Sequence, residues 1–156
     1  MEKLDQVDIL TRREIEALIA GPLIRAFMDE LGREKALEIV KPLIEKLAEE
    51  SGRAAAKRVG GDSIDHFATA MEAWSAGDAY RFNLVQQTEE AYDWDVTHCA
   101  YADMYCRLGL ADLGFHLSCA RDFAMVQGFN PKMRLARTKT CMQGDDICDF
   151  RLRLNK

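Results

Sequence analysis

A predicted helical stretch, HLSCARDFAMVQGFNP at residues 116–131, holds several side chains that can do chemistry. His116, Cys119 and Asp122 follow one another at intervals of three, so they are neighbours on a helix surface. We expect His116 on the face of Cys119, with Asp122 on the adjacent side. A thiol acts as a nucleophile in its thiolate form, which needs a nearby base or positive charge. The spacing predicts either a nucleophile activated by His116 or Arg121, or a cysteine that packs as a small buried hydrophobic residue.

Arg137 is the second candidate for chemistry. In KMRLARTKTC, residues 132–141, it shares one face of a predicted strand with Met133 and Leu135, and we expect all three to point inward. An inward arginine needs an anion, because an unpaired buried charge costs several kcal/mol. Arg137 therefore forms either a structural ion pair or a clamp for a substrate carboxylate, which the guanidinium fork suits.

Three further cysteine and histidine positions leave a metal site open as an alternative. His98 and Cys99 end a predicted strand, and in ICDFRLRL the alternation turns Cys148 toward the core and Asp149 away from it. If the elements converge, Cys99, Cys119 and Cys148 provide thiolates that suit zinc. The chain has no CxxC or HxxxH motif, so we expect no cofactor and keep zinc as the alternative.

Composition limits the classes of function. The 156 residues predict a single domain, 1–156, with a net charge of -5. Apolar runs are short and the N-terminus is charged, which favours a cytoplasmic protein over a membrane-spanning or secreted one. Five cysteines, an odd number, favour reduced thiols. Basic residues near the C-terminus alternate with apolar ones, so we expect no nucleic-acid partner. No GxGxxG, P-loop or GxSxG motif is present.

The N-terminal half, residues 1–78, is predicted to be mostly helical. A capping box at Thr11–Glu14 opens the first helix, and Gly21-Pro22 divides it or kinks it. Residues 33–59 have helical apolar spacing and stop at Gly60-Gly61. Asp62-Ser63 then caps a helix that runs to about Ala76.

The C-terminal half predicts a sheet. Alternating residues from Tyr80 and again from Tyr92 predict a hairpin, and residues 99–127 return to helical spacing. Two further strands, residues 132–141 and 147–154, are joined by a turn-like QGDD. We expect an α+β domain whose antiparallel sheet of about four strands is covered by helices on one face.

A series of short motifs runs through this half in a fixed order: HCAY at 98–101, LGLADLG at 108–114, CARD at 119–122, GFNP at 128–131, RTKT at 137–140, Gly144, and CDFR at 148–151. Together they resemble the L-2-amino-thiazoline-4-carboxylic acid hydrolase family over residues 80–154. The resemblance implies hydrolytic opening of a small cyclic amidine or isothiourea ring, at a carbon–nitrogen bond that is not a peptide bond.

The resemblance also implies site residues. Those that match the family pattern most closely are Cys99, Cys119, Asp122, Arg137, Cys148 and Asp149. His116 lies outside the pattern, so the resemblance favours Cys119 acting with Asp122 over Cys119 acting with His116. We expect catalytic roles for Cys119, Asp122 and Cys148, and contacts to substrate from Arg137, His98, Cys99, His116 and Asp149.

Two mechanisms and a second class of function remain open. Cys119 attacks the amidine carbon while Asp122 moves protons and Arg137 holds the substrate carboxylate, or zinc on the three thiolates activates water with Asp122 as the base. The competing class is a non-catalytic domain that binds a small molecule in the same pocket as a sensor or carrier. A small-molecule substrate and a homodimer are the expected partners.

Overall fold

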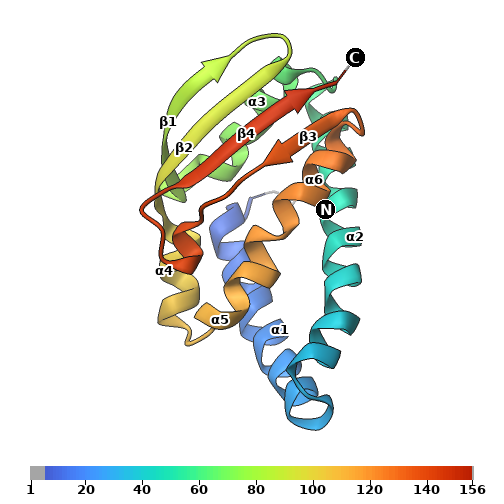
Figure 1. The fold of residues 1–156 in the computed structure, drawn as a ribbon, viewed down its shortest axis with the longest axis vertical. Helices are drawn as coiled ribbons and strands as arrows, with labels where there is room; N and C mark the ends of the chain where they lie inside the picture. The colour runs from blue at the N-terminus through green and yellow to red at the C-terminus, as the bar shows by residue number, and fades with distance from the viewer. Residues whose placement is uncertain (1–5, 156) are drawn as a thin grey trace.

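Two long antiparallel helices lead into the fold in the computed structural model, which describes residues 6–155 (Figure 1). Helix α1 (Ile9–Leu31) begins at Asp8, whose carboxylate accepts hydrogen bonds from the Thr11 amide at 2.9 Å and the Thr11 hydroxyl at 2.7 Å. The predicted cap at Thr11 is therefore wrong by one turn, because Asp8 supplies the acceptor for the first free amides. The helix runs through Pro22 as one element and not as two.

Helix α2 (Arg33–Val59) also contains a proline, Pro42, and ends at the predicted glycine. Gly60 has φ +81°, a left-handed conformation that glycine adopts without strain, and its amide donates back to the Ala56 carbonyl. Helix α3 (Ile64–Ser75) starts at the predicted cap, where the Ser63 hydroxyl accepts from the His66 amide at 3.3 Å. Both predicted boundaries are confirmed.

The sheet has four antiparallel strands in the order β1-β2-β4-β3. After the short turn η1 (Ala76–Asp78) come β1 (Tyr80–Gln87) and β2 (Ala91–Cys99), and the chain closes with β3 (Met133–Ala136) and β4 (Cys148–Leu154). The predicted α+β class, with its helical N-terminal half, is confirmed. The predicted strand 132–141 is too long, because the chain leaves the sheet after Ala136 and enters the 3₁₀ turn η3 (Cys141–Gln143).

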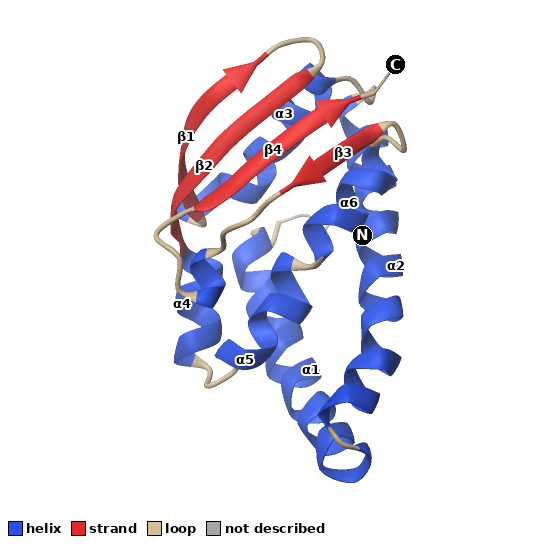
Figure 2. Ribbon diagram, viewed as in Figure 1, coloured by secondary structure: helices blue, strands red, loops and turns tan. Residues whose placement is uncertain are grey.

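Between the two hairpins lie four short helical elements: α4 (Ala100–Arg107), α5 (Ala111–Gly114), the π-helical turn η2 (Phe115–Cys119) and α6 (Arg121–Phe129). Figure 2 shows that helices lie against one face of the sheet. Trp94, Val96, Cys148 and Leu152 point to that face and are buried. The strand alternation read from the sequence is thus confirmed for β2 and β4.

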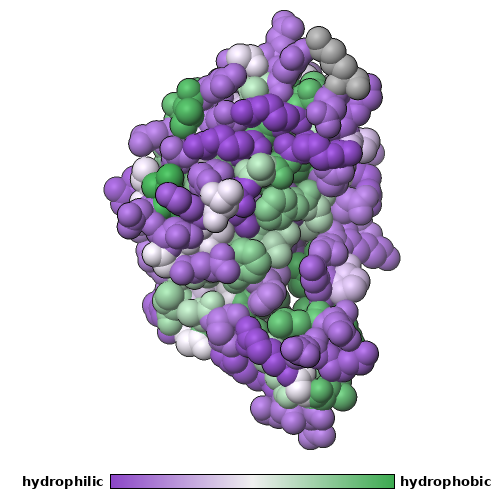
Figure 3. All heavy atoms as spheres, in the orientation of Figure 1, coloured by the Kyte–Doolittle hydropathy of each residue, from purple (hydrophilic) through white to green (hydrophobic). Residues whose placement is uncertain are grey.

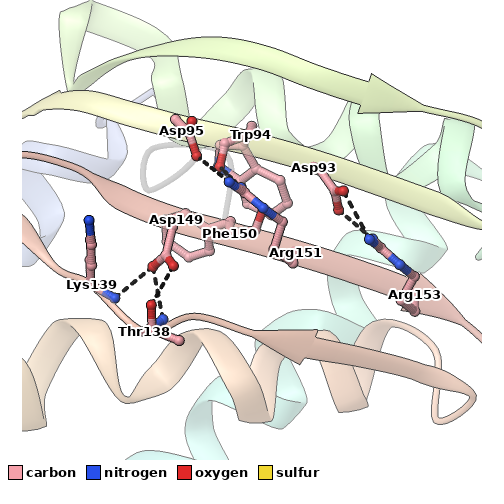
Figure 4. Close-up of polar contacts among 9 residues, drawn as sticks. All are labelled: Asp93, Trp94, Asp95, Thr138, Lys139, Asp149, Phe150, Arg151 and Arg153. Carbon is pink, nitrogen blue, oxygen red and sulfur yellow. Dashed lines mark hydrogen bonds and ion pairs between the residues drawn. The ribbon is translucent and has the colours of Figure 1, made fainter.

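The opposite face of the sheet is covered by charged side chains. Figure 3 shows hydrophilic atoms across the strands, and the close-up in Figure 4 shows Arg151 on Asp95 and Arg153 on Asp93, cross-strand pairs between β4 and β2. Opposite charges on neighbouring strands add modestly to sheet stability. Only the helix-covered face is therefore available for an enclosed site.

Two glycines let α2 and α6 cross with their backbones in contact. A Cβ atom at Gly52 would overlap the carbonyl of Met125, and one at Gly128 would overlap the carbonyl of Glu49. Both carbonyls belong to the backbone, so they can move aside only if a helix moves. This crossing fixes α6, and α6 carries Asp122.

Gly128→Ala is expected to destabilise the protein by about 3 kcal/mol or more, because the added methyl group forces α6 away from α2. At an ordinary helix position the same change is stabilising by about 1 kcal/mol. Urea unfolding of the variant and the wild type checks the sign. A stabilised variant would show that the helices do not approach as closely as described.

None of the helices within residues 6–155 is long and apolar enough to cross a membrane.

Candidate active site

A cavity of about 130 Å³ lies between the inner face of the sheet and the helices that cover it. Its walls are mostly apolar, and Trp94 forms part of one wall, stacked on Phe150 with ring centroids 4.6 Å apart. Seven of the side chains that line it are titratable and belong to the motifs: Cys99, Tyr101, Cys119, Arg121, Asp122, Arg137 and Cys148. Apolar walls with a few polar groups are typical of small-molecule sites.

An ion pair between Asp122 and Arg137 is the most polar feature of the cavity. Arg137 follows β3 and its side chain is only 2% exposed, so the predicted inward orientation is confirmed. The guanidinium Nη1 lies 2.5 Å from the Asp122 Oδ2, and Nη2 donates to the Cys119 carbonyl at 3.2 Å. Asp122 is therefore the anion that an inward arginine requires.

Aromatic rings enclose the rest of the guanidinium. The Arg137 Cζ lies 5.1 Å from the ring centroids of both Phe123 and Phe150, and 5.9 Å from that of Phe115. A guanidinium over ring faces is attracted by their π electrons. The rings hold Arg137 in place and screen its pair with Asp122 from bulk water.

The protonation of Asp122 reflects two opposing effects. Burial raises the pKa of Asp122, while the charge and hydrogen bond of Arg137 lower it, and the balance is a pKa of about 6. The side chain keeps 33% of its surface accessible, on the cavity side. A carboxyl group with this pKa exchanges protons readily near neutral pH, as a general acid or base must.

The raised pKa of Asp122 predicts a pH-dependent stability. Between the ordinary value of 3.8 and about 6 the folded state binds more protons than the unfolded state, so this group's contribution to the free energy of unfolding falls as pH rises. We expect the stability of the wild type relative to Asp122→Asn, which does not titrate, to be greater at about pH 4 than at about pH 7. Urea unfolding of both proteins measures it, and an equal difference at the two pH values would contradict the burial of this carboxyl.

Cys119 is the last residue of the π-helical turn, separated from α6 by Ala120, and it lines the cavity. Burial raises the pKa of its thiol far above the ordinary range, and the Asp122 carboxylate raises it further, against the opposing charge of Arg137. Burial likewise raises the pKa of Cys99 to about 11 and that of Cys148 to about 12. These thiols are protonated near neutral pH, so Cys119 needs a base that takes its proton as it reacts.

The π-helical turn separates His116 from Cys119. The Ala120 amide donates to the Phe115 carbonyl, five residues back, at 2.8 Å, so this turn holds more residues than an α-helical turn. The regular helical spacing used for the prediction does not hold here. His116 does not line the cavity, and burial together with the charges of Arg33 and Lys41 lowers its pKa.

Two other predicted contacts to substrate also lie outside the cavity lining. His98 is 39% exposed and lies 3.6 Å from the Asp103 carboxylate. Asp149 accepts hydrogen bonds from the Thr138 amide at 2.8 Å, the Thr138 hydroxyl at 2.6 Å and the Lys139 amide at 2.6 Å (Figure 4). Asp149 thus fixes the loop that directly follows Arg137, where it acts on the position of the arginine.

The thiols do not form a metal site in this arrangement. Within residues 6–155, no three or more His, Cys, Asp or Glu side chains lie close enough together to hold a metal ion. Cys99, Cys119 and Cys148 all line the cavity, but they do so from β2, η2 and β4.

Sequence reasoning missed several polar side chains of the cavity. Tyr101 lines it and donates to the Trp74 carbonyl at 3.2 Å. Tyr80 and Trp94 also line it, and in the described part of the chain the Tyr80 hydroxyl and the Trp94 Nε1 are buried with no hydrogen-bond partner. Their alternation marked them as inward strand residues, but nothing in the pattern distinguished a cavity wall from a packed core.

The fold and the cavity define an α+β domain with a partly enclosed, mostly apolar cavity between its sheet and its helices. The family model of L-2-amino-thiazoline-4-carboxylic acid hydrolase matches residues 12–152, and the chain belongs to this family. The match extends well beyond residues 80–154, so the N-terminal helices are part of the family's domain. Comparison with curated proteins finds no match.

Two solved structures share the fold. A trafficking protein particle complex subunit 3 from Naegleria fowleri, covalently bound to palmitic acid, is 12% identical, with a TM-score of 0.58 over 94% of this chain and 96% of that chain. The phenol-responsive sensory domain of the transcription activator PoxR, with phenol, is also 12% identical, with a TM-score of 0.56 over 86% of this chain and 72% of that one. At these identities the likeness concerns the fold alone.

Proposed function

We propose that the protein is a hydrolase that opens a small cyclic amidine or isothiourea ring at a carbon–nitrogen bond other than a peptide bond. The substrate class is that of the family, whose name gives L-2-amino-thiazoline-4-carboxylate. The observation that carries the proposal is the grouping of Cys119 and Asp122 on one cavity wall, with Asp122 held by Arg137. A nucleophile, a proton carrier and a fixed cation thus meet in a space enclosed by apolar side chains.

The chemistry follows from the protonation states. Asp122 takes the proton of the Cys119 thiol as the sulfur attacks the amidine carbon, because no thiolate exists beforehand. A tetrahedral adduct forms, Asp122 returns the proton to the ring nitrogen, and the ring carbon–nitrogen bond breaks. Water, deprotonated by Asp122, then attacks the same carbon and releases the Cys119 thiol. The net change is addition of one water to the substrate.

Arg137 contributes to these steps through its charge. By lowering the pKa of Asp122, Arg137 keeps this carboxyl ionised in most molecules near neutral pH. An ionised Asp122 also matches a cyclic amidinium, whose two N–H groups face two carboxylate oxygens. A substrate carboxylate reaches the same guanidinium, which has further N–H groups besides those on Asp122 and on the Cys119 carbonyl.

The test is steady-state hydrolysis of L-2-amino-thiazoline-4-carboxylate by the purified protein, followed as a product that carries one more water than the substrate. We expect kcat/KM to fall as pH drops below about 6, because Asp122 must be ionised to accept the proton. Absence of turnover for this compound and for related cyclic amidines, at all pH values tested, would overturn the proposal.

A second candidate is a domain that binds a small molecule without converting it. The apolar cavity walls and the protonated thiols favour it, and the fold is shared with a phenol-responsive sensory domain. In that case phenol and small apolar ligands raise the melting temperature and cyclic amidines are not hydrolysed. Turnover that depends on Cys119 excludes this candidate.

A further inference from the structure

A large apolar surface remains uncovered on the first two helices. In the described part of the chain, nine large aliphatic or aromatic side chains of α1 and α2 are between 43% and 63% exposed. They are Ile15, Leu18, Ile19, Leu23, Phe27 and Leu31 on α1, and Ile39, Leu43 and Leu47 on α2. We call these nine residues the α1/α2 apolar surface.

The spacing of these residues makes them continuous ridges. On α1, five of the six follow one another at intervals of four from Ile15 to Leu31, and the three on α2 repeat that interval. Residues four apart form the ridges by which helices pack into the grooves of other helices. The same α1 buries Ala17 and Ile24 against its own chain, so among residues 6–155 this helix has a second apolar side that stays exposed.

The size of the surface fits a stable dimer. Nine large side chains at about half exposure present roughly 800 Å², which equals the area that each partner buries in a standard protein–protein interface. The largest apolar patch of a typical monomer is only about 300–600 Å². In Figure 3, apolar atoms are visible among hydrophilic ones in the lower part of the molecule, above its hydrophilic tip.

The charges around the surface favour a protein partner over a lipid bilayer. Residues 9–50 contain 7 Lys and Arg against 9 Asp and Glu, a net charge of -2 by subtraction, with both signs interspersed. An anionic membrane attracts helices that are rich in lysine and arginine on the polar side, and this one is not. Because both signs are interspersed, charges on one copy can pair with opposite charges on another, and the net charge of -2 opposes the contact only weakly.

We propose that the α1/α2 apolar surface is the interface of a homodimer, in which the same helices of two copies pack on each other around a two-fold axis. A two-fold arrangement covers both helices of both copies in one contact, and it is the commonest symmetry of soluble oligomers. The proposal concerns a surface separate from the cavity and does not depend on the proposed reaction.

The test is the molar mass of the full chain by size-exclusion chromatography with light scattering, over a dilution series. The wild type is expected at twice the 17.7 kDa of one chain. Ile19→Glu with Leu43→Glu changes the most exposed residue of each ridge and is expected to raise the dimer dissociation constant at least about a hundredfold. Because both side chains are exposed within one chain, the variant should keep its helical circular dichroism.

Leu84→Glu with Val85→Glu is the matched control, since both side chains are more than half exposed but lie on β1. This variant is expected to remain dimeric. A wild type that is monomeric at all concentrations, or a dimer that persists in the Ile19 and Leu43 variant, overturns the proposal. Co-sedimentation of a monomeric wild type with phosphatidylcholine–phosphatidylserine vesicles would also overturn it and assign the surface to a membrane.

Discussion

Cys119→Ser is expected to lower kcat for ring opening by at least about a thousandfold, because a serine hydroxyl is a far weaker nucleophile than a thiol when a carboxyl group serves as the base. Asp122, with a pKa of about 6, is able to accept a thiol proton as the sulfur attacks, but it is too weak a base for a hydroxyl. The two side chains have nearly the same volume, so the buried wall of the cavity keeps its packing. The melting temperature should change by no more than about 2 °C.

Cys106→Ser is the matched control, because Cys106 is an exposed cysteine on α4 and does not line the cavity. Its kcat should equal that of the wild type. If Cys119→Ser retains wild-type kcat, the nucleophile is not this thiol, and the covalent mechanism fails even though the cavity remains a binding site.

Arg137→Met should have the second large effect, because it changes both the free energy of unfolding and the pH dependence of kcat/KM. The free energy of unfolding is expected to fall by about 2–3 kcal/mol, less than for a fully enclosed pair because Asp122 neutralises itself by taking a proton. Without the guanidinium the pKa of Asp122 rises above its value of about 6, so the pH at which kcat/KM reaches half its maximum moves upward. Urea unfolding and a pH profile measure the two effects.

A substrate series separates the two roles of Arg137. If the guanidinium also holds the substrate carboxylate, KM for the carboxylate rises in Arg137→Met while KM for the corresponding amide changes little. An unchanged KM for both would rule out the clamp and leave only the effect on Asp122. Arg151→Met, which removes an arginine that is 34% exposed and paired with Asp95 on the outer face of the sheet, is the control and should cost at most about 1 kcal/mol.

Local patterns were sufficient for those parts of the fold whose cause is local. The glycine stop of α2, the Ser63 cap of α3 and the alternation of β2 and β4 each depend on residues next to one another in the chain. The inward orientation of Arg137 followed in the same way, although β3 itself ends one residue earlier. The need of a buried cation for an anion then pointed to a carboxylate without showing which one.

Other features depend on contacts that no local pattern encodes. The π-helical turn at Phe115–Cys119 adds a residue to one turn and so removes His116 from the cavity, while no residue type marks such a turn. Tyr80 and Tyr101 reach the cavity from different elements, and Asp149 acts on Arg137 through the backbone of Thr138 and Lys139. These placements arise when the sheet and the helices pack.

The central claim is that Cys119 forms a covalent intermediate with a cyclic amidine while Asp122 carries the proton. The measurement that tests it most directly is intact-protein mass spectrometry after rapid acid quench of wild-type protein mixed with L-2-amino-thiazoline-4-carboxylate. The predicted result is a mass increase equal to the substrate, located on Cys119 by peptide mapping and absent in Cys119→Ser, with formation of hydrolysed product. Hydrolysis that proceeds equally well in Cys119→Ser, with no adduct at any quench time, would contradict the account.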